Sequence, residues 1–494
     1  MKIRKSAIAI FFAIGVLAGC RNTDNASVQN IPIINKALYD TASVFYADFS
    51  QYPTELKELP IGVFDSGTGG LTVLEKLLAL DAFNNIDGQS LSDSLKDFAG
   101  EHFIYLADQC NMPYGQYDAC KKADYLEELV IKDALFLMGD KYYTNPFEAK
   151  PTGSKPKVKI MVIACNTATA YGLKDVQSML EQSGTGVKVI GVINAGVKAT
   201  LDQMKDETAP YAIGVLATQG TISSGAYERT IKEEVAARGI QQEVVVVNQS
   251  GYGFAESVDS EPDYVNVNLT EPRDSYKGPR FGFEDADIKP ELLSVYNFDM
   301  TEGRVLATEE NGNYTQFQLN NAINYARFNL VSLVERHRAS GSTVPLKAVI
   351  LGCTHYPFLI ETLQQVIQEL RDYTVNGSHP YRHLIADDFT FIDPAVYTAI
   401  ECYSTLRADG NLAFSDKPTR VSPYISVPSG SLKAENLTED GNLKYEFKYG
   451  REVGTEEITT KAVPFSKSNI DATNLARLEK LVPYSYELIY PTMQ

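Results

Sequence analysis

The sequence VKIMVIACNTA occupies residues 158–168, and a second stretch of the same kind, AVILGCTHYP, occupies residues 348–357. Each contains an apolar run rich in Val and Ile that ends at or just before a cysteine, Cys165 in the first and Cys353 in the second. Continuous apolar runs of this length are typical of strands buried inside a parallel sheet. Because open α/β sheets bind ligands at the carboxyl ends of their strands, both cysteines are predicted to lie where such a sheet holds its ligand.

A cysteine in this setting has two opposing interpretations. Donors on neighbouring Asn, Thr or His residues can stabilise its thiolate, which is the form that acts as a base, a nucleophile or a metal ligand. A single buried cysteine more commonly packs as a small hydrophobic residue, but two at equivalent strand ends favour the functional interpretation. A disulfide between Cys165 and Cys353 is an alternative in an oxidising compartment. A zinc site would need further ligands, so we expect no metal.

A glycine-rich turn follows the first predicted strand of the compact part of the chain. The apolar run 61–64 leads into Asp-Ser-Gly-Thr-Gly-Gly at 65–70, and leucines then recur at helical spacing from Leu71 to Leu78. This order predicts a strand, a turn and a helix, as in a βα unit. Amides at such a helix start attract an anion, and a carboxylate would serve as well as a phosphate. Thr72 stands where Gly-x-Gly-x-x-Gly needs its third glycine and no Gly-Lys-Ser/Thr follows, so we exclude a dinucleotide or a nucleotide phosphate.

Strands and helices alternate along much of the chain, which is the pattern of a doubly wound α/β fold. The expected strands are 103–106, 159–164, 187–192, 212–216, 243–247 and 348–351, and the expected helices are 123–138, 322–338 and 358–370. Between about 250 and 318 the chain is polar, acidic and broken by prolines, so we predict an insertion whose aromatic residues form a small folded excursion or a lid. Beyond residue 409 we expect short strands at 424–427 and 444–449 and a final helix near 471–481.

The first twenty residues resemble a bacterial lipoprotein signal. Residues 1–5 are basic, 7–16 are apolar, and Leu-Ala-Gly-Cys follows at 17–20. In such signals the cysteine becomes the lipid-modified first residue of the mature protein, which implies that Cys20 provides a lipid anchor to a membrane, with the protein facing the periplasm or the cell surface. The apolar stretch is too short to span a bilayer comfortably. An ordinary membrane helix, or a cytosolic start with a chance apolar run, are the alternatives.

Charge and cysteine content narrow the function further. The 494 residues carry a formal net charge of −18, whereas nucleic-acid binding requires clustered Lys and Arg, so we expect no nucleic-acid partner. Five cysteines remain besides Cys20. Because five is odd, an exported protein keeps at least one of these thiols unpaired, which fits a catalytic thiol better than a disulfide scaffold.

Four motifs, in this order, resemble those of glutamate racemases in the cofactor-independent aspartate/glutamate racemase superfamily. They are Gly62 to Val73, Pro113-Tyr114-Gly115, Ala164 to Ala168 and Leu351 to Pro357. The resemblance runs from about residue 60 to about 407 without the insertion. It implies an α/β protein with two pseudo-symmetric doubly wound domains, the active site between them, and no cofactor. The implied division is a signal peptide at 1–20, a tether and leader helix at 21–59, one domain from 60–192 with 385–494, and a second from 193–384 that contains the insertion.

Racemisation sets a geometric requirement for the site. Inverting an α-carbon requires removing its hydrogen from one face and delivering a proton to the other, so two acid/base groups must flank the substrate. By resemblance, Cys165 and Cys353 fill these two roles, and Asp65 assists the first while His355 assists the second. The resemblance also implies a small amino-acid substrate and allows a homodimer. The implied substrate contacts are Asp65, Ser66, Tyr114, Gly115, Asn166, Thr167, Thr354 and His355.

Most of these residues also have a structural interpretation. Asp65 can cap the following helix, and His355 can make a structural hydrogen bond. Asn166 and Thr167 can likewise cap a helix, and Tyr114-Gly115 can be a plain turn.

Two departures from the racemase pattern concern the substrate. Racemases usually carry arginine where Asn111 stands, and an Ala-Cys-Pro segment where this chain has 248–253, a region that borders their side-chain pocket. The sequence predicts a glutamate racemase, and racemisation of aspartate or another amino acid is an alternative. His355 favours glutamate, because aspartate racemases usually have an acidic residue there. An exported amino-acid binding protein is a further alternative, although binding alone does not require two opposed thiols. Glutamate racemases ordinarily serve peptidoglycan synthesis, which implies a role in cell-wall biogenesis and cell shape.

Overall fold

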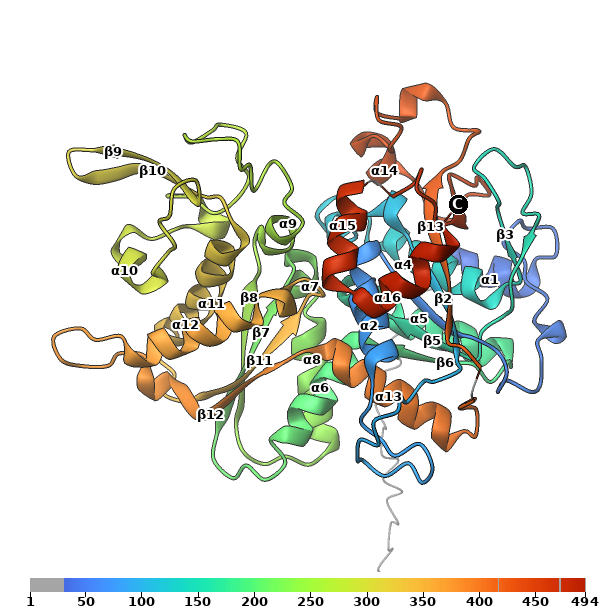
Figure 1. Cartoon of the computed structure of the whole chain (residues 1–494), viewed down its shortest axis with the longest axis horizontal. Coiled ribbons are helices and arrows are strands. Elements are labelled where there is room, and N and C mark those ends of the chain that lie inside the picture. Colours follow the sequence, from blue (N-terminus) through green and yellow to red (C-terminus); the bar gives the residue numbers. More distant parts are fainter. Residues whose placement is uncertain (1–30, 416, 471, 494) are drawn as a thin grey trace, which may run out of the picture. The chain divides into compact units, whose positions relative to one another are not determined.

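The structure, a computed structural model, describes residues 31–415, 417–470 and 472–493 and contains two main β-sheets (Figure 1). The predicted signal peptide and its Cys20 lie outside the described residues. Helices separate most of the strands along the chain. The predicted α/β fold class is confirmed.

The larger sheet has six strands in the order β14-β13-β2-β1-β5-β6. The strands are β1 (Ile61–Asp65), β2 (His102–Ala107), β5 (Ile160–Ile163), β6 (Lys188–Gly191), β13 (Arg420–Pro428) and β14 (Thr460–Pro464). All neighbours are parallel except β14, which runs antiparallel to β13. The first four strands follow the predicted ranges closely, and the C-terminal extension adds the last two.

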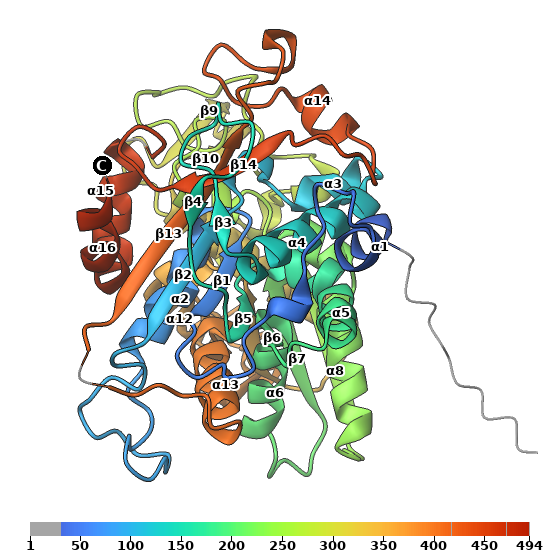
Figure 2. The same cartoon turned by 90° about the vertical axis from the view of Figure 1, so that its right-hand side faces the viewer.

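Burial explains why the larger sheet has helices on both faces. Every residue of β1 and β5 is buried, and successive side chains of a strand point to opposite faces. Val63 packs in a core with α2 (Leu71–Ala79), α13 (Pro394–Ala408), α15 (Ala472–Leu481) and α16 (Pro483–Ile489). Its neighbour Phe64 packs in a second core with α1 (Pro32–Tyr39), α4 (Ala123–Met138) and α5 (Asn166–Ser183). Figure 2 shows α15 and α16 on one side of the sheet and α1 and α4 on the other.

The smaller sheet has four parallel strands in the order β12-β11-β7-β8. They are β7 (Tyr211–Ala217), β8 (Val244–Ser250), β11 (Leu346–Gly352) and β12 (Ile385–Ile392). One face packs against α6 (Val192–Gln203) and α8 (Ala226–Ala237), and the other against α11 (Ala322–Ala339) and α12 (Ile360–Asp372). The predicted boundary at 384/385 assigns β12 to the domain of the larger sheet. In the structure β12 pairs with β11 of the smaller sheet. The division into domains otherwise stays a prediction.

The segment predicted as an insertion is folded onto the smaller sheet. It contains α9 (Phe254–Val258), α10 (Leu293–Tyr296) and an antiparallel pair, β9 (Val305–Glu310) with β10 (Asn313–Leu319), seen in yellow-green in Figure 1. Buried aromatic residues of the segment, among them Tyr276, Tyr296 and Phe317, join the core that includes α11. These side chains give the polar segment an apolar anchor, as its aromatic content predicted.

The C-terminal extension differs from the sequence prediction at several elements. The sequence predicts neither β14 nor α16, so the helix expected near 471–481 is not the last one. Residues 444–449, predicted as a strand, form helix α14 (Tyr445–Gly450). The alternating aromatic residues that indicated a strand do not share a buried face, because Tyr449 is buried against Tyr117 whereas Tyr445 is 55% exposed. Residues 445–450 join neither main sheet, so the alternation has no consequence for the backbone there.

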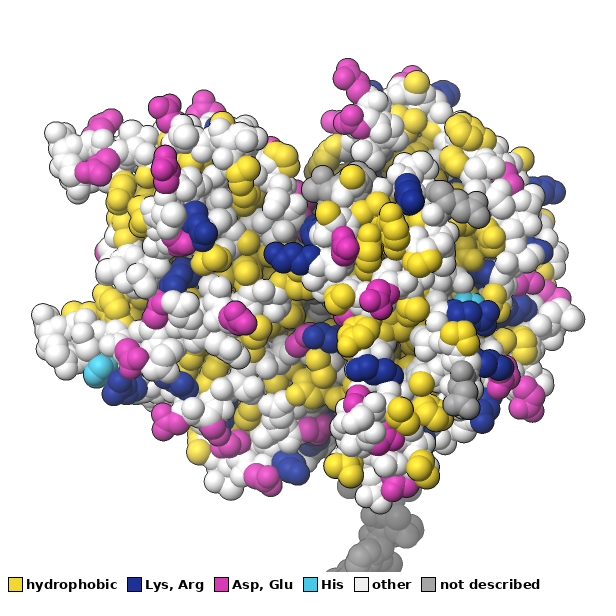
Figure 3. All heavy atoms as spheres, viewed as in Figure 1, with side chains coloured by type: hydrophobic (Ala, Val, Ile, Leu, Met, Phe, Trp, Pro, Cys, Tyr) yellow, Lys and Arg dark blue, Asp and Glu magenta, His cyan; other side chains and the backbone are white. Residues whose placement is uncertain are grey.

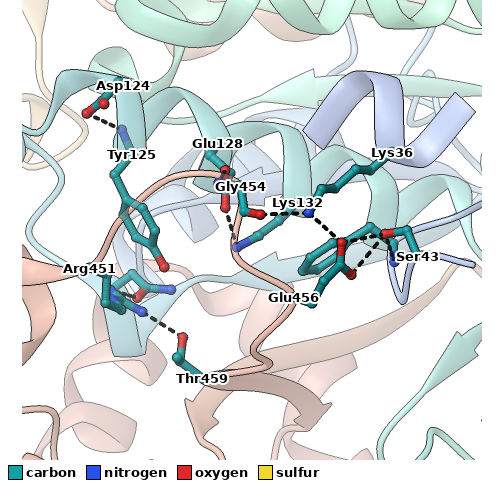
Figure 4. A network of polar contacts seen from close by, with 12 residues as sticks. Lys36, Ser43, Asp124, Tyr125, Glu128, Lys132, Arg451, Gly454, Glu456 and Thr459 are labelled. Carbon is teal, nitrogen blue, oxygen red and sulfur yellow. Dashed lines mark hydrogen bonds and ion pairs between the residues drawn. The ribbon is translucent and has the colours of Figure 1, made fainter. Parts of the chain in front are cut away.

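Polar contacts tie the same extension to the start of the described chain (Figure 4). Lys36 of α1 donates to the carbonyl of Gly454 at 2.6 Å and pairs with Glu456, whose carboxylate also accepts from Ser43. The amide of Gly454 in turn donates to Glu128 of α4 at 2.6 Å. These contacts bind the extension to α1 and α4 shortly before the chain returns to the larger sheet as β14.

Two observations concern the helices and the charged surface of the described chain. Within the described part of the chain, none of the helices combines the length and the apolar character needed to cross a membrane. On the face drawn in Figure 3, lysine and arginine side chains are interspersed with acidic ones and do not gather in one large patch.

A buried ion pair at the start of β5 yields a stability prediction. Lys159, the charged residue inside the apolar run 158–164, donates to both carboxylate oxygens of Glu101 at 2.7 Å, and the two side chains are 0% and 2% exposed. Removing one partner leaves a buried charge uncompensated, so Glu101→Gln is expected to lower the free energy of unfolding by about 3–5 kcal/mol. Urea unfolding followed by circular dichroism measures this change.

The matched control is Glu58→Gln. Glu58 lies 3.7 Å from Lys417 in a pair whose side chains are 75% and 73% exposed, and exposed pairs contribute at most about 1 kcal/mol. Equal stability losses in the two variants would contradict the role assigned to the buried pair.

Candidate active site

A cavity of about 750 Å³ lies where the carboxyl ends of strands from both sheets converge. Asp65 ends β1, Cys165 follows β5 and Cys353 follows β11. Every residue that the sequence predicts in catalysis or substrate contact lines this one cavity: Asp65, Ser66, Tyr114, Gly115, Cys165, Asn166, Thr167, Cys353, Thr354 and His355. The two quoted stretches of sequence therefore meet in space, although 187 residues separate their cysteines along the chain (353 − 165 − 1).

Cys165 is buried at the start of α5, near the carboxyl group of Asp65. Its sulfur accepts a hydrogen bond from the amide of Ala168 at 3.4 Å and lies 3.5 Å from the hydroxyl oxygen of Ser66. Burial and the nearby carboxyl of Asp65 raise the pKa of the Cys165 thiol to about 12, against the smaller opposing effect of the Ala168 and Ser66 donors. At neutral pH this thiol holds its proton.

Asp65 shapes the glycine-rich turn and borders the cavity at the same time. Its Oδ2 accepts hydrogen bonds from the amides of Gly67 at 3.1 Å and Gly70 at 2.8 Å. A Cβ at Gly70 would lie 2.3 Å from the Cβ of Asp65, so this approach requires glycine. The sequence predicts that amides of this turn bind an anion such as a carboxylate. In the structure, these two amides bind the carboxyl group of Asp65. Burial raises the pKa of Asp65, against the opposing effect of these amides.

Cys353 lies beside an ion pair formed by His355 and Asp259. Its sulfur is 3.5 Å from Nδ1 of His355, and Nε2 of His355 is 3.2 Å from Oδ1 of Asp259. Burial lowers the pKa of His355, but the ion pair with Asp259 and the contact with Cys353 outweigh it and hold the pKa well above its usual range. Burial raises the pKa of Asp259, yet His355 and Arg477 bring it below its usual value. His355 is therefore an imidazolium, a charge that favours a neighbouring thiolate.

Hydrogen bonds join the start of α5 to helices that follow β7 of the smaller sheet. Tyr227 of α8 donates to the side-chain oxygen of Asn166 at 2.7 Å, and the hydroxyl of Thr167 is 3.2 Å from that of Thr221 in α7 (Gln219–Ser223). The alternative in which Asn166 and Thr167 cap a helix is not the arrangement found, because the sulfur of Cys165 makes the side-chain cap of α5.

Glycines allow close approach at two further points around the cavity. A Cβ at Gly220 would lie 2.6 Å from the Cα of Gly115, and one at Gly69 would lie 3.0 Å from Cε1 of His355. The Pro-Tyr-Gly motif and the glycine-rich turn thus both touch segments associated with the smaller sheet. Gly115 is the first residue of α3 (Gly115–Ala119), so the motif is more than a plain turn.

Tyr114 borders the cavity, but its hydroxyl binds a buried pair of carboxyl groups. The phenol oxygen is 2.6 Å from Asp108 and 2.8 Å from Asp133. A phenol has one hydrogen, so one of these contacts requires a proton on a carboxyl group. Asn111 donates to both oxygens of Asp108, which suits a carboxylate there and a protonated Asp133.

Arg451, from the C-terminal extension, joins this network from the other side. Its guanidinium donates to the side-chain oxygen of Asn111 at 2.6 Å and to the hydroxyl of Tyr117 at 2.9 Å. The resemblance to racemases implies an arginine at position 111. In this protein the asparagine at that position holds an arginine that comes from 340 residues further along the chain.

Several cavity residues were not predicted from the sequence. Glu256, Asp259 and Glu261 come from α9 and the loop that follows it, and Arg477 comes from α15. Neither segment falls in the range covered by the racemase resemblance, and neither carries a motif. A charged residue in a polar insertion or a terminal helix gives no signal in a single sequence until the fold brings it to a cavity.

Comparison with known proteins identifies relatives for part of the chain. No protein-family model matches it. It is 32% identical over 183 residues to the glutamate racemase of Oceanobacillus iheyensis. This alignment covers 36% of this chain and 50% of that protein. It is 34% identical over 209 residues to the glutamate racemase of Limosilactobacillus fermentum, which covers 41% of this chain and 61% of that protein. Part of the chain is related to glutamate racemases.

The relationship with glutamate racemases is limited in extent. The chain spans about half to three-fifths of the length of these two relatives. Among solved structures, the glutamate racemase of Francisella tularensis in complex with D-glutamate covers 81% of this chain and 99% of its own, at 18% identity and a TM-score of 0.41. The sequence similarity to these two glutamate racemases covers 36% and 41% of the chain.

The carboxyl pair around Tyr114 yields a pH prediction. Burial, together with the charge of Asp108, raises the pKa of Asp133 well above its usual range, whereas in the unfolded chain it is about 4. The protonated carboxyl stabilises the fold at low pH, and this contribution is lost as the pH rises toward the folded-state pKa. Asp133→Asn keeps a donor to Tyr114 without a titrating group. Its free energy of unfolding, relative to the wild type, is expected to rise between pH 5 and pH 8.

Urea unfolding at both pH values measures the difference. Asp124→Asn on the same helix is the control, because Asp124 is exposed, and its effect is expected to be the same at both pH values. A difference for Asp133→Asn that is flat or falls with pH would contradict a protonated Asp133.

Proposed function

We propose that the protein is a cofactor-independent amino-acid racemase that interconverts L- and D-glutamate. The observation that carries this proposal is that two cysteines, one after a strand of each sheet, line one cavity together with Asp65 and His355. The sequence relationship with glutamate racemases supports the same reaction class.

The two thiols have different surroundings. Cys165 holds its proton, and Cys353 lies beside the imidazolium of His355. As a thiolate, Cys353 takes the α-hydrogen of one enantiomer as a proton, so that an S–H bond forms while the electron pair of the C–H bond passes into a planar carbanion. The S–H bond of Cys165 then breaks and delivers its proton to the opposite face. The other enantiomer reacts with the roles exchanged.

Proton transfer accounts for only part of the rate. General acid/base catalysis contributes about 10²–10⁴-fold, so stabilisation of the carbanion and its carboxylate must supply most of the remainder. Hydroxyl and amide groups that line the cavity, among them Ser66, Asn166 and Thr354, can donate to those charges.

Exchange of the α-hydrogen with D₂O tests the proposal. The wild-type protein, kept reduced, is expected to exchange and racemise both enantiomers of glutamate, as followed by proton NMR and circular dichroism. Cys165→Ser and Cys353→Ser are each expected to lower racemisation by about 10²–10⁴-fold, because a hydroxyl is a far weaker acid than a thiol.

The matched control is Cys120→Ser, since Cys120 is a half-buried free cysteine that does not line the cavity. Its racemisation rate is expected to stay at the wild-type level. Faster exchange of aspartate would assign a different substrate to the same chemistry. Calorimetric binding of glutamate without exchange of any acidic amino acid would contradict racemisation and favour the binding-protein alternative.

We also propose that Cys20 carries a lipid anchor that holds the protein at a membrane outside the cytoplasm. This proposal is supported by the signal-like residues 1–20. Cys20→Ser is expected to move the protein from the membrane fraction to the soluble fraction of lysed cells, as detected by immunoblot. Asn25→Ser, in the predicted tether, is the control. If the wild type and both variants divide between the membrane and soluble fractions in the same proportion, the lipid anchor is contradicted.

A further inference from the structure

The C-terminal extension forms part of the wall of the candidate active site. Asn469, Ile470, Asn474 and Arg477 all line the cavity. Asn474 and Arg477 stand three residues apart on α15, which puts them on the same side of the helix. Leu475 and Leu478 of the same helix pack in the core that contains α2. Anchored by these leucines, α15 presents Asn474 and Arg477 to the cavity.

Arg477 is the one lysine or arginine among the described residues that line the cavity. Its Nη1 pairs with Oδ1 of Asp259, the same oxygen that lies 3.2 Å from Nε2 of His355. The side chains of Arg477 and Asp259 are 21% and 19% exposed. A single carboxylate thus joins the guanidinium to the histidine beside Cys353, which brings a permanent positive charge close to the candidate reaction centre.

The remaining charge on this side of the cavity is acidic. Glu256 and Glu261 line it together with Asp259. Such a wall attracts the ammonium group of an amino acid but repels a second carboxylate. Burial raises the pKa of Glu256 and, to about 7, that of Glu261, which reduces this repulsion. Arg477 and His355 are the groups on this wall that can balance the charge of a substrate with two carboxylates.

We propose that Arg477 binds a carboxylate of an acidic amino-acid substrate and is a specificity-determining residue of the site. The inference rests on the proposed function. A guanidinium has five N–H donors, and Asp259 engages it through Nη1, so donors remain for a bidentate contact with a second carboxylate. Asp259 holds the guanidinium in position and shares its charge with His355.

Substrate selectivity tests this role better than rate alone. Arg477→Gln is expected to raise the KM for glutamate about 10- to 100-fold, since hydrogen bonds to charged groups contribute about 1.5–3 kcal/mol. It is expected to change the KM for glutamine much less, so that the preference for glutamate over glutamine shrinks. Arg477→Lys keeps the charge and loses the bidentate geometry, so its KM for glutamate is expected to lie between those of the wild type and Arg477→Gln.

Lys480→Gln is the matched control, because Lys480 is exposed on the same helix and its substitution removes the same charge. It is expected to keep the wild-type KM for both substrates. Circular dichroism of each variant checks the fold, and Arg477→Lys supplies the test if Arg477→Gln does not fold. A purely structural Arg477 would alter the rates for glutamate and glutamine alike, and that outcome would overturn the proposal.

Calorimetry with glutarate separates this inference from the proposed function. Glutarate has two carboxylates and no α-amino group, so its binding does not require racemisation. Weaker glutarate binding by Arg477→Gln than by the wild type supports the role of Arg477 even if the wild type exchanges no amino acid. A wild type that racemises glutamate, with an Arg477→Gln variant of unchanged KM, selectivity and glutarate affinity, overturns the inference and leaves the proposed function standing.

Discussion

The parallel pairing of fully buried strands is the constraint on which the site depends. Strands such as β5 and β11 are buried along their length and, apart from Lys347 near the start of β11, are apolar. Their buried positions therefore leave little room for polar chemistry before the backbone leaves the sheet. In both sheets the first polar residues after the central strands are therefore found at the carboxyl edge. Cys165 and Cys353 occupy this position, and the cavity between the strand ends is lined by both.

The two halves of the cavity differ in charge, and the difference has a local cause. On one side, the carboxyl group of Asp65 accepts hydrogen bonds from the amides of its own turn, and Cys165 caps α5 near that carboxyl group. On the other side, Asp259 keeps His355 charged beside Cys353. The two cysteines therefore lie in different electrostatic surroundings, one near a carboxyl group and the other beside a charged histidine.

Segments outside the racemase-like part of the chain contribute much of the polar surroundings of the site. The insertion provides Asp259, and the C-terminal extension provides Arg451 and Arg477. The extension also completes the larger sheet with β13 and β14 and is bound to α1 and α4 through Gly454 and Glu456. It is therefore an integral part of the fold, and its residues reach the cavity from a fixed position.

The amino-acid sequence by itself determined the α/β class, most strands of both sheets and both cysteine-bearing strand ends, because hydrophobic periodicity and glycine-rich turns act over a few neighbouring residues. It did not determine the helix at 445–450, where aromatic alternation was present without a sheet to use it. Only the tertiary structure decided that Asp259 and Arg477, 218 residues apart, share one ion pair beside His355. Such contacts depend on the packing of α9 and α15 onto separate sheets, and no local pattern of residues encodes that distance.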